Sequence, residues 1–341
     1  MGSLNMTTKT PSTHLINESF EGVHQALDRV AVQAELSRLP FFRDDAALPE
    51  LTAIRLNRHK PGRRCLIEYD LLVKQPSHRP WRLTLMAKIR MKSHDHSTWI
   101  VLNRLWAAGM NEQAGDGIAL PHPVGEIPHW HMWLQSKVPG VTLERRLAGP
   151  LGEHLAERVA EAAHKIHRSG VPARRRHTMV DELQILHERL GKTARAYPQW
   201  SNRIGRIIDH CERLGNRVTS APFCGIHRDF YADQIIADNE MLYLLDFDLY
   251  CKGDPALDIG NFIAHITEFS LRNLGDASAL AHVEQALEAR FLRLNPGISA
   301  QAIRAYATLA LARHIHISTL FTQRRPYTRA LLELTEQRLG I

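Results

Sequence analysis

The chain has 341 residues, of which 44% are hydrophobic and 23% are charged, with a formal net charge of +7 at pH 7. This composition is typical of a globular protein, and at about 150 residues per domain the length predicts two domains or lobes. No apolar run approaches the ~18 residues that a membrane span needs, and the N-terminus lacks the pattern of a signal peptide, so we expect neither. The four cysteines form no CxxC pair, which favours reduced thiols and a cytoplasmic protein.

Hydrophobic spacing predicts a first helix over residues 20–38. Residues 51–73 then predict two strands joined by a turn at Pro61-Gly62, and residues 81–91 predict a third strand whose side chains alternate between two faces. A helix follows over residues 97–108, ended by Gly109.

A Pro-rich stretch then leads to a strand over residues 131–138. Strands with one helix among them predict a small antiparallel sheet lobe over residues 1–137.

After Pro139-Gly140 the pattern becomes mainly helical. Helices are predicted near residues 152–168, 180–196, 201–218, 256–273, 279–293 and 299–322, with one more at the C-terminus. The only strands that we expect here are short, over residues 234–237 and 242–246. The predicted fold class is therefore α+β, with a sheet lobe followed by a helical lobe over residues 138–341.

Acidic and amide side chains gather between Cys224 and Phe262. Asp229, on a loop, can accept or orient the proton of a hydroxyl group. Gln234 can turn its carbonyl oxygen towards the same site, and Asp246 ends an apolar strand that presents it rigidly. Because Mg²⁺ prefers oxygen ligands together with phosphate and water, we predict that Gln234 and Asp246 bind Mg²⁺ beside a catalytic Asp229.

Structural roles are expected for three neighbours of these residues. His227 orients the loop, Asp254 caps the helix that follows Pro255, and Asp258 is a hydrogen-bonding residue rather than a catalyst. The chain has 20 histidines but no HExxH motif, so no histidine is predicted to bind a metal.

The segment as a whole resembles the aminoglycoside phosphotransferase family of kinases, which includes choline-kinase-like enzymes. The signature H-x-D-x-x-x-x-N is matched by His227, Asp229 and Gln234, with Gln in place of Asn. Asp246 matches the family's strand aspartate, and residues 253–258 match its G-D-P-x-x-D segment. The resemblance covers roughly residues 50–320. It implies a two-lobed protein-kinase-like fold, with Asp229 as the catalytic aspartate.

The resemblance also implies a nucleotide site. Lys88 matches the family's phosphate-binding lysine, although the helix after it has no acid and Asp95 is the nearest candidate partner. Arg63, in a turn rich in cations, is expected to neutralise phosphate charge. Ser136 and Val138 lie where the family reads adenine through backbone groups, so ATP is expected between the lobes.

These features predict an ATP-dependent, Mg²⁺-dependent kinase that phosphorylates a hydroxyl of a small molecule. A protein kinase is an alternative, because His227-Arg228-Asp229 is a literal HRD, but no DFG or APE follows. A catalytically impaired pseudokinase is another, given Gln234 and the missing helix acid. Nucleic-acid binding is not favoured, because the arginines are scattered. The acceptor, the choice of ATP or GTP and the oligomeric state stay open.

Overall fold

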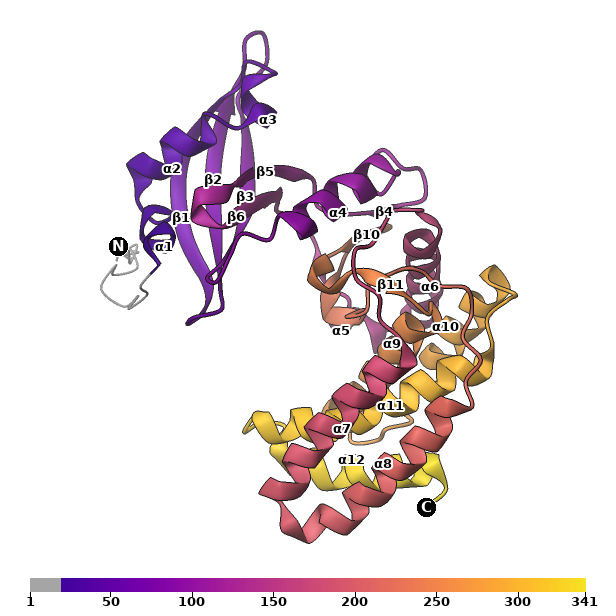
Figure 1. Cartoon of the computed structure of the whole chain (residues 1–341). Coiled ribbons are helices and arrows are strands. Elements are labelled where there is room, and N and C mark those ends of the chain that lie inside the picture. The colour runs from indigo at the N-terminus through magenta and orange to yellow at the C-terminus, as the bar shows by residue number, and fades with distance from the viewer. Residues whose placement is uncertain (1–19) are drawn as a thin grey trace, which may run out of the picture. The chain divides into compact units, whose positions relative to one another are not determined.

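Residues 20–341, which the computed structural model describes, divide into two units (Figure 1). The first contains the chain up to Trp106 together with Pro121–Val138. The second contains Ala107–Leu120 together with Pro139–Ile341.

The first unit is built on a five-stranded antiparallel sheet. Its order is β1-β2-β3-β6-β5, comprising β1 (Leu48–Lys60), β2 (Arg64–Lys74), β3 (Trp81–Arg90), β6 (Met132–Ser136) and β5 (Pro123–Ile127). The turn between β1 and β2 and the strands β3 and β6 confirm the sequence predictions. The prediction missed β5, because its Pro and Gly are residues that strands usually avoid.

The helices that precede the sheet pack into its core. They are α1 (Glu21–Gln25), α2 (Arg29–Leu36) and α3 (Pro40–Arg43), whose buried side chains join those of β2 and β3. The single helix predicted over residues 20–38 is wrong, because Asp28 interrupts it. Its extended backbone and its carboxylate, which accepts a hydrogen bond from Ala31 N at 2.8 Å, begin a new helix instead.

The two faces of the sheet differ in chemistry. On β3, Leu85, Ala87 and Ile89 face the hydrophobic core, as the alternation predicts. Cross-strand pairing places Lys88, Trp133 and Glu126 in one row on the opposite face. Helix α4 (His96–Ala107) follows β3. Gly109 lies just beyond its end with φ +94°, which is the predicted helix stop.

The second unit consists mainly of helices. They are α5 (Glu144–Leu147), α6 (Gly152–Arg168), α7 (Met179–Ala196), α8 (Ser201–Asn216), α9 (Ala256–Phe269), α10 (Ala281–Leu294), α11 (Ala300–Leu320) and α12 (Thr328–Leu339). A π-helical turn, Ser270–Leu274, extends α9. The six predicted helices and the C-terminal one are confirmed. α11 packs against α7, α9 and α12 and is buried on most of its surface (Figure 1).

Two small sheets lie among these helices. One has the order β4-β10-β9-β7, from β4 (Ile118–Ala119), β10 (Met241–Leu244), β9 (Ile235–Asp238) and β7 (Val141–Thr142). The other pairs β8 (Cys224–Ile226) with β11 (Cys251–Gly253). Strands β9 and β10 confirm the predicted pair, but the expectation of no further strands is wrong. The additional strands have two or three residues each, too few to show a periodic pattern.

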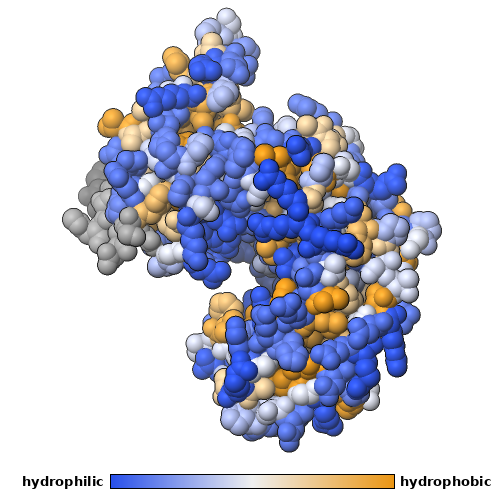
Figure 2. All heavy atoms as spheres, in the orientation of Figure 1, coloured by the Kyte–Doolittle hydropathy of each residue, from blue (hydrophilic) through white to orange (hydrophobic). Residues whose placement is uncertain are grey.

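The hydropathy of the described helices and surface can be compared with what a bilayer and water require. Among the helices of residues 20–341, none combines the length and apolar character needed to cross one. On the face drawn in Figure 2, hydrophilic side chains predominate and apolar ones occur in separate groups.

Candidate active site

The loop between β8 and β9 carries His227, Asp229 and Gln234, and a buried carboxylate holds its first residues. Asp258, in the first turn of α9, accepts hydrogen bonds from the backbone N–H of His227 at 2.9 Å and of Arg228 at 2.7 Å. The same carboxylate accepts from His167 Nε2 at 2.9 Å. Asp258 therefore has the structural role that the sequence predicts, and it fixes the backbone directly before Asp229.

His227 ties this loop to the segment that contains Asp246. Its Nε2 donates to the carbonyl oxygen of Leu245 at 2.8 Å, and its ring packs against Phe230 and Phe247. The orienting role predicted for His227 is confirmed. Because Leu245 immediately precedes Asp246, one imidazole links the backbones that carry the two aspartates.

Asp229 is half-buried and has acidic and basic neighbours. Burial raises the pKa of its carboxyl, neighbouring His227 lowers it, and the Asp246 carboxylate raises the pKa further. Arg313 and Arg228 act in the same direction as His227. The effect of Asp246 on this pKa agrees with the hydrogen bond that joins the two segments, and it places the two carboxylates in one electrostatic environment.

Gln234 is oriented by a tyrosine. Its Nε2 donates to the hydroxyl of Tyr231 at 3.0 Å, and the Tyr231 ring stacks on His265 with ring centroids 4.2 Å apart. Burial raises the pKa of Tyr231 to about 12, so the hydroxyl stays protonated. Among the described residues the side-chain carbonyl oxygen of Gln234 has no hydrogen-bond partner, which leaves it available as a ligand.

Asp246 does not end a strand, which corrects the sequence prediction. β10 ends at Leu244, and Asp246 precedes a 3₁₀ turn, Phe247–Leu249. Its φ is +60°, in the left-handed region, and Arg228 has φ +70°. A non-glycine residue in a strained backbone conformation costs about 1–3 kcal/mol and persists where the surroundings enforce it, often at functional sites.

A second network of buried polar side chains, which was not found by sequence reasoning, holds the loop that carries Asp229. Arg313 of α11 donates to Glu182 of α7 at 3.0 Å and to the Asn261 side-chain oxygen at 2.6 Å. Asn261 in turn donates to the carbonyl oxygen of Phe230 at 2.9 Å. Burial alone would raise the pKa of Glu182, but Arg313 and His177 lower it to about 2. Glu182 and Arg313 lie 131 residues apart, so no local pattern connects them.

The residues predicted to bind the nucleotide lie in the first unit. Lys88 is only 4% exposed, and its Nζ lies 5.5 Å from the centroid of the Trp133 ring. The Asp95 carboxylate, the nearest candidate partner of Lys88 in the sequence, accepts hydrogen bonds from Arg90 at 3.3 Å and from Thr98 Oγ1 at 2.8 Å. It also accepts from Thr98 N, so Asp95 caps the start of α4.

Arg63, Ser136 and Val138 differ in their surroundings. Arg63 is exposed in the turn between β1 and β2. Ser136 is held by the backbone of His122. The His122 carbonyl oxygen accepts a hydrogen bond from Ser136 N at 2.9 Å, and His122 N donates to Ser136 Oγ at 2.9 Å. The N–H of Val138 makes no hydrogen bond within residues 20–341.

Comparisons with known proteins give a family match and fold matches. The phosphotransferase enzyme family model matches residues 58–296. No curated protein sequence matches the chain. The chain is similar to a solved choline kinase from Cryptosporidium parvum Iowa II, with a TM-score of 0.59 and 12% identity over 92% of this chain and 96% of that one.

Two further solved structures are similar. A spectinomycin phosphotransferase in complex with ADP and spectinomycin has a TM-score of 0.58 and 12% identity, over 86% of this chain and 94% of that one. A putative aminoglycoside phosphotransferase from Ralstonia eutropha JMP134 has a TM-score of 0.58 and 13% identity, over 92% and 98%. At these identities the likeness is one of fold, and it confirms the predicted α+β kinase-like fold class.

Proposed function

Because the chain belongs to the phosphotransferase enzyme family and is a small-molecule phosphotransferase, we propose that it transfers the γ-phosphoryl group of ATP to an acceptor hydroxyl, with Asp229 orienting that hydroxyl. The observation that carries the assignment is the hydrogen bond from His227 to the carbonyl oxygen of Leu245, which joins the segments that bear Asp229 and Asp246 beside an oriented Gln234. Burial raises the pKa of Asp229, which makes this carboxylate a stronger base than an exposed one.

The donor set fits Mg²⁺. Asp246 offers a carboxylate, and Gln234 offers a carbonyl oxygen whose amide nitrogen is already held by Tyr231. We assign these two side chains as the protein ligands of the ion. When bound, Mg²⁺ neutralises phosphate charge during transfer. Replacing the Asn of the family signature by Gln preserves the carbonyl ligand, and the Tyr231 contact limits the freedom of the longer side chain.

Nucleotide contacts are assigned to the first unit. Lys88 is the proposed phosphate ligand, held in place by burial and by Trp133, and Arg63 adds a flexible positive charge. For adenine we assign the N–H of Val138, which is uncommitted, and the carbonyl oxygen of Ser136. In this assignment residues 1–137 form the nucleotide-binding lobe and residues 138–341 the catalytic and substrate lobe.

The acceptor that we propose carries an amine as well as a hydroxyl. Burial and the neighbouring Asp233 raise the pKa of Glu144, so two carboxylates lie close together beside the loop of Gln234. Arg272 lies 3.5 Å from Glu144 and offsets part of this charge. The similar solved structures include kinases of choline, ethanolamine and glucosamine, which all carry a hydroxyl together with an amino or quaternary ammonium group, and none of these is a protein kinase or a pseudokinase.

The test is turnover of the wild type and of Asp229→Asn with ATP and Mg²⁺ across amino alcohols, aminosugars and neutral sugars. The wild type should release ADP with at least one amine-bearing acceptor. Asp229→Asn should lower kcat about 10²–10⁴-fold while ATP binding is unchanged, because only the orienting carboxylate is lost. Asp209→Asn, an exposed substitution on α8, is the control and should keep full activity. An Asp229→Asn variant with wild-type kcat would overturn the assignment.

A further inference from the structure

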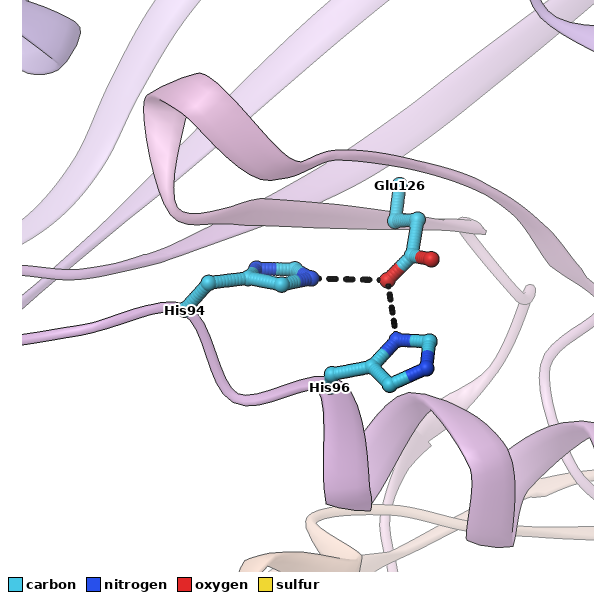
Figure 3. A group of neighbouring side chains, drawn as sticks. All are labelled: His94, His96 and Glu126. Carbon is cyan, nitrogen blue, oxygen red and sulfur yellow. Dashed lines mark hydrogen bonds and ion pairs between the residues drawn. The ribbon is translucent and has the colours of Figure 1, made fainter.

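Two histidines and a glutamate, none of them assigned to catalysis, meet in the first unit, and Figure 3 shows how they lie. His94 and His96 lie in the segment that joins β3 to α4, and Glu126 belongs to β5. His94 Nε2 lies 2.7 Å and His96 Nδ1 lies 3.0 Å from the same oxygen, Glu126 Oε2. All three ligand atoms lie within 4.8 Å of one another.

The chemistry of this cluster is that of a transition-metal site. Imidazole nitrogens and a carboxylate are a common ligand set for zinc, and three protein ligands leave the fourth position for water. Ligand atoms of a tetrahedral zinc ion lie about 3.3 Å apart when the bonds are about 2.0–2.1 Å long. The observed separations of 2.7 and 3.0 Å are a few tenths of an ångström shorter, so small side-chain rotations make room for an ion.

The surroundings of the cluster allow an ion to enter. His96 is 57% exposed, which gives a route from solvent and room for a water ligand. The second carboxylate oxygen of Glu126 makes no hydrogen bond with the described residues and is free to adjust. A single imidazole would be enough to satisfy this Glu126 oxygen by hydrogen bonding. Here both rings bring a nitrogen to the same carboxylate oxygen, so three ligand atoms of the kind that zinc binds are gathered in one place (Figure 3).

We propose that His94, His96 and Glu126 bind one divalent transition-metal ion, for which zinc is the best match. The Nδ1 of His94 is buried without a hydrogen-bond partner, so this ligand lacks the outer acceptor that usually strengthens zinc–histidine bonds. The site therefore has moderate affinity, about 10–100-fold weaker than one with a complete outer shell.

The position of the site gives the ion a structural role. Asp95, between the two histidines, caps α4, so the ion joins the start of this helix to strand β5. Glu126 also lies in the same cross-strand row as Trp133 and Lys88. At about 4.8 Å between neighbouring strands, the backbone of Glu126 lies about 10 Å from that of Lys88, and both side chains are on the same face of the sheet.

The experiment is calorimetric titration of the chelator-treated full-length protein with Zn²⁺ in millimolar Mg²⁺. Mg²⁺ occupies oxygen-ligand sites, while imidazole favours zinc. The wild type should bind one Zn²⁺ per chain, and its melting temperature should rise with Zn²⁺. Glu126→Gln and His96→Gln should each weaken binding at least 10-fold and abolish the rise in melting temperature. Absorption of the Co²⁺-loaded wild type should have the intensity of a four-coordinate site.

The control is His129→Gln. His129 is 58% exposed, close to the value for His96, and its neighbour Glu35 lies 3.7 Å away. Its zinc affinity should equal that of the wild type. Unchanged zinc binding in Glu126→Gln and His96→Gln, or an absence of zinc binding in the wild type, would overturn the proposal. Circular dichroism verifies folding, and exposed His96→Gln decides the question if Glu126→Gln does not fold. Neither outcome bears on Asp229, because no assigned catalytic residue is changed.

Discussion

At the scale of single residues, Asp258 holds the loop of the candidate active site in place. Its carboxylate accepts two backbone N–H groups and one imidazole N–H, so both oxygens act only as acceptors. The backbone directly before Asp229 has no comparable support from other side chains in the described part of the chain. The position of the Asp229 carboxylate, the proposed orienting group, therefore depends on Asp258, a residue with a structural role.

Asp258→Asn tests this dependence. One oxygen becomes an NH₂ group facing an N–H donor, so we expect the free energy of unfolding to fall by about 1–3 kcal/mol. Because the Asp229 loop shifts, kcat should fall as well, with little change in the KM for ATP. Chemical denaturation and steady-state kinetics measure the two effects. The control is Asp254→Asn, a buried carboxylate in the same segment whose Oδ1 accepts from Ala256 N. It should lose stability but keep kcat, and an Asp258→Asn variant with unchanged kcat would contradict the positioning role.

The residues of the candidate site differ in how far a sequence could reveal them. Asp229, Gln234 and Asp246 stand in a short ordered motif, so the sequence identifies them as candidates, and their roles stay predictions. The sequence could not show that Tyr231 orients Gln234, because this depends on a turn of the loop. Nor could it show the Glu182–Arg313 pair, which joins two helices far apart in the chain.

At the scale of elements, α9 and α11 approach each other closely at Gly260. A Cβ atom at this position would lie 2.6 Å from Tyr306 Cβ and 2.7 Å from Ala307 N. These are atoms of the other helix's backbone and of the start of a side chain, so they cannot rotate away. The absence of a side chain at residue 260 therefore allows the helix that carries Asp258 to pack against the central α11.

Gly260→Ala should destabilise the protein although alanine favours helix. The helix preference contributes about 1 kcal/mol in favour of alanine, while overpacking costs about 1–3 kcal/mol, so we expect a net loss. Gly205→Ala on α8 is a matched control, because a Cβ there meets no atom within 4 Å. It should raise the melting temperature, whereas Gly260→Ala should lower it. Thermal melts followed by circular dichroism compare the two, and equal shifts would refute the close-packing argument.

The elements were predictable to the extent that their own residues determine them. Long amphipathic helices such as α6 and α8 match the sequence because burial of one face repeats every 3.6 residues. The prediction of one continuous first helix was wrong at Asp28, because the capping hydrogen bond of this side chain begins a new helix within an apolar pattern that continues on both sides. β5 and the shortest strands form through pairing with distant segments, and such pairing leaves little trace in the local sequence.

At the scale of the whole molecule, buried ionisable groups make stability depend on pH. Burial and the nearby Arg313 lower the pKa of His314 to about 3, and burial with His314 lowers the pKa of His265. Both rings are neutral in the folded state and become protonated on unfolding below their ordinary pKa of 6.5. The unfolded state then binds more protons, so stability falls as pH falls from 6.5 towards 3.

His314→Phe should reduce this acid sensitivity. Phenylalanine preserves a ring that can pack edge-on against His265, as the 81° interplanar angle indicates, but it cannot titrate. Each unit of pKa difference corresponds to about 1.4 kcal/mol, so the midpoint of urea unfolding should fall less steeply between pH 6.5 and 4 than in the wild type. Far-ultraviolet circular dichroism follows the helices during the titration. An unchanged slope would show that His314 does not control the acid response.

Below this range a second group adds to the same trend. Glu182 has a pKa of about 2 in the folded state, lower than its ordinary 4.5, so its contribution to stability is lost as pH falls from 4.5 towards 2. The raised pKa of Asp229 acts in the opposite direction, because protonation relieves its repulsion with Asp246. The His314→Phe comparison is therefore cleanest above pH 4.5.

The left-handed backbone at Arg228 and Asp246 has a consequence for how the acceptor preference of such a protein can evolve. The hydrogen bonds of Asp258 on α9 and of His227 hold these two residues in their left-handed conformations, so the folded protein already offsets the conformational free energy that they cost. Acceptor preference can therefore diverge through helices such as α5 and α10 while the carboxylates proposed for catalysis and metal binding keep their arrangement. A laboratory search for new acceptors would do best to leave both bends untouched and vary the helices around them.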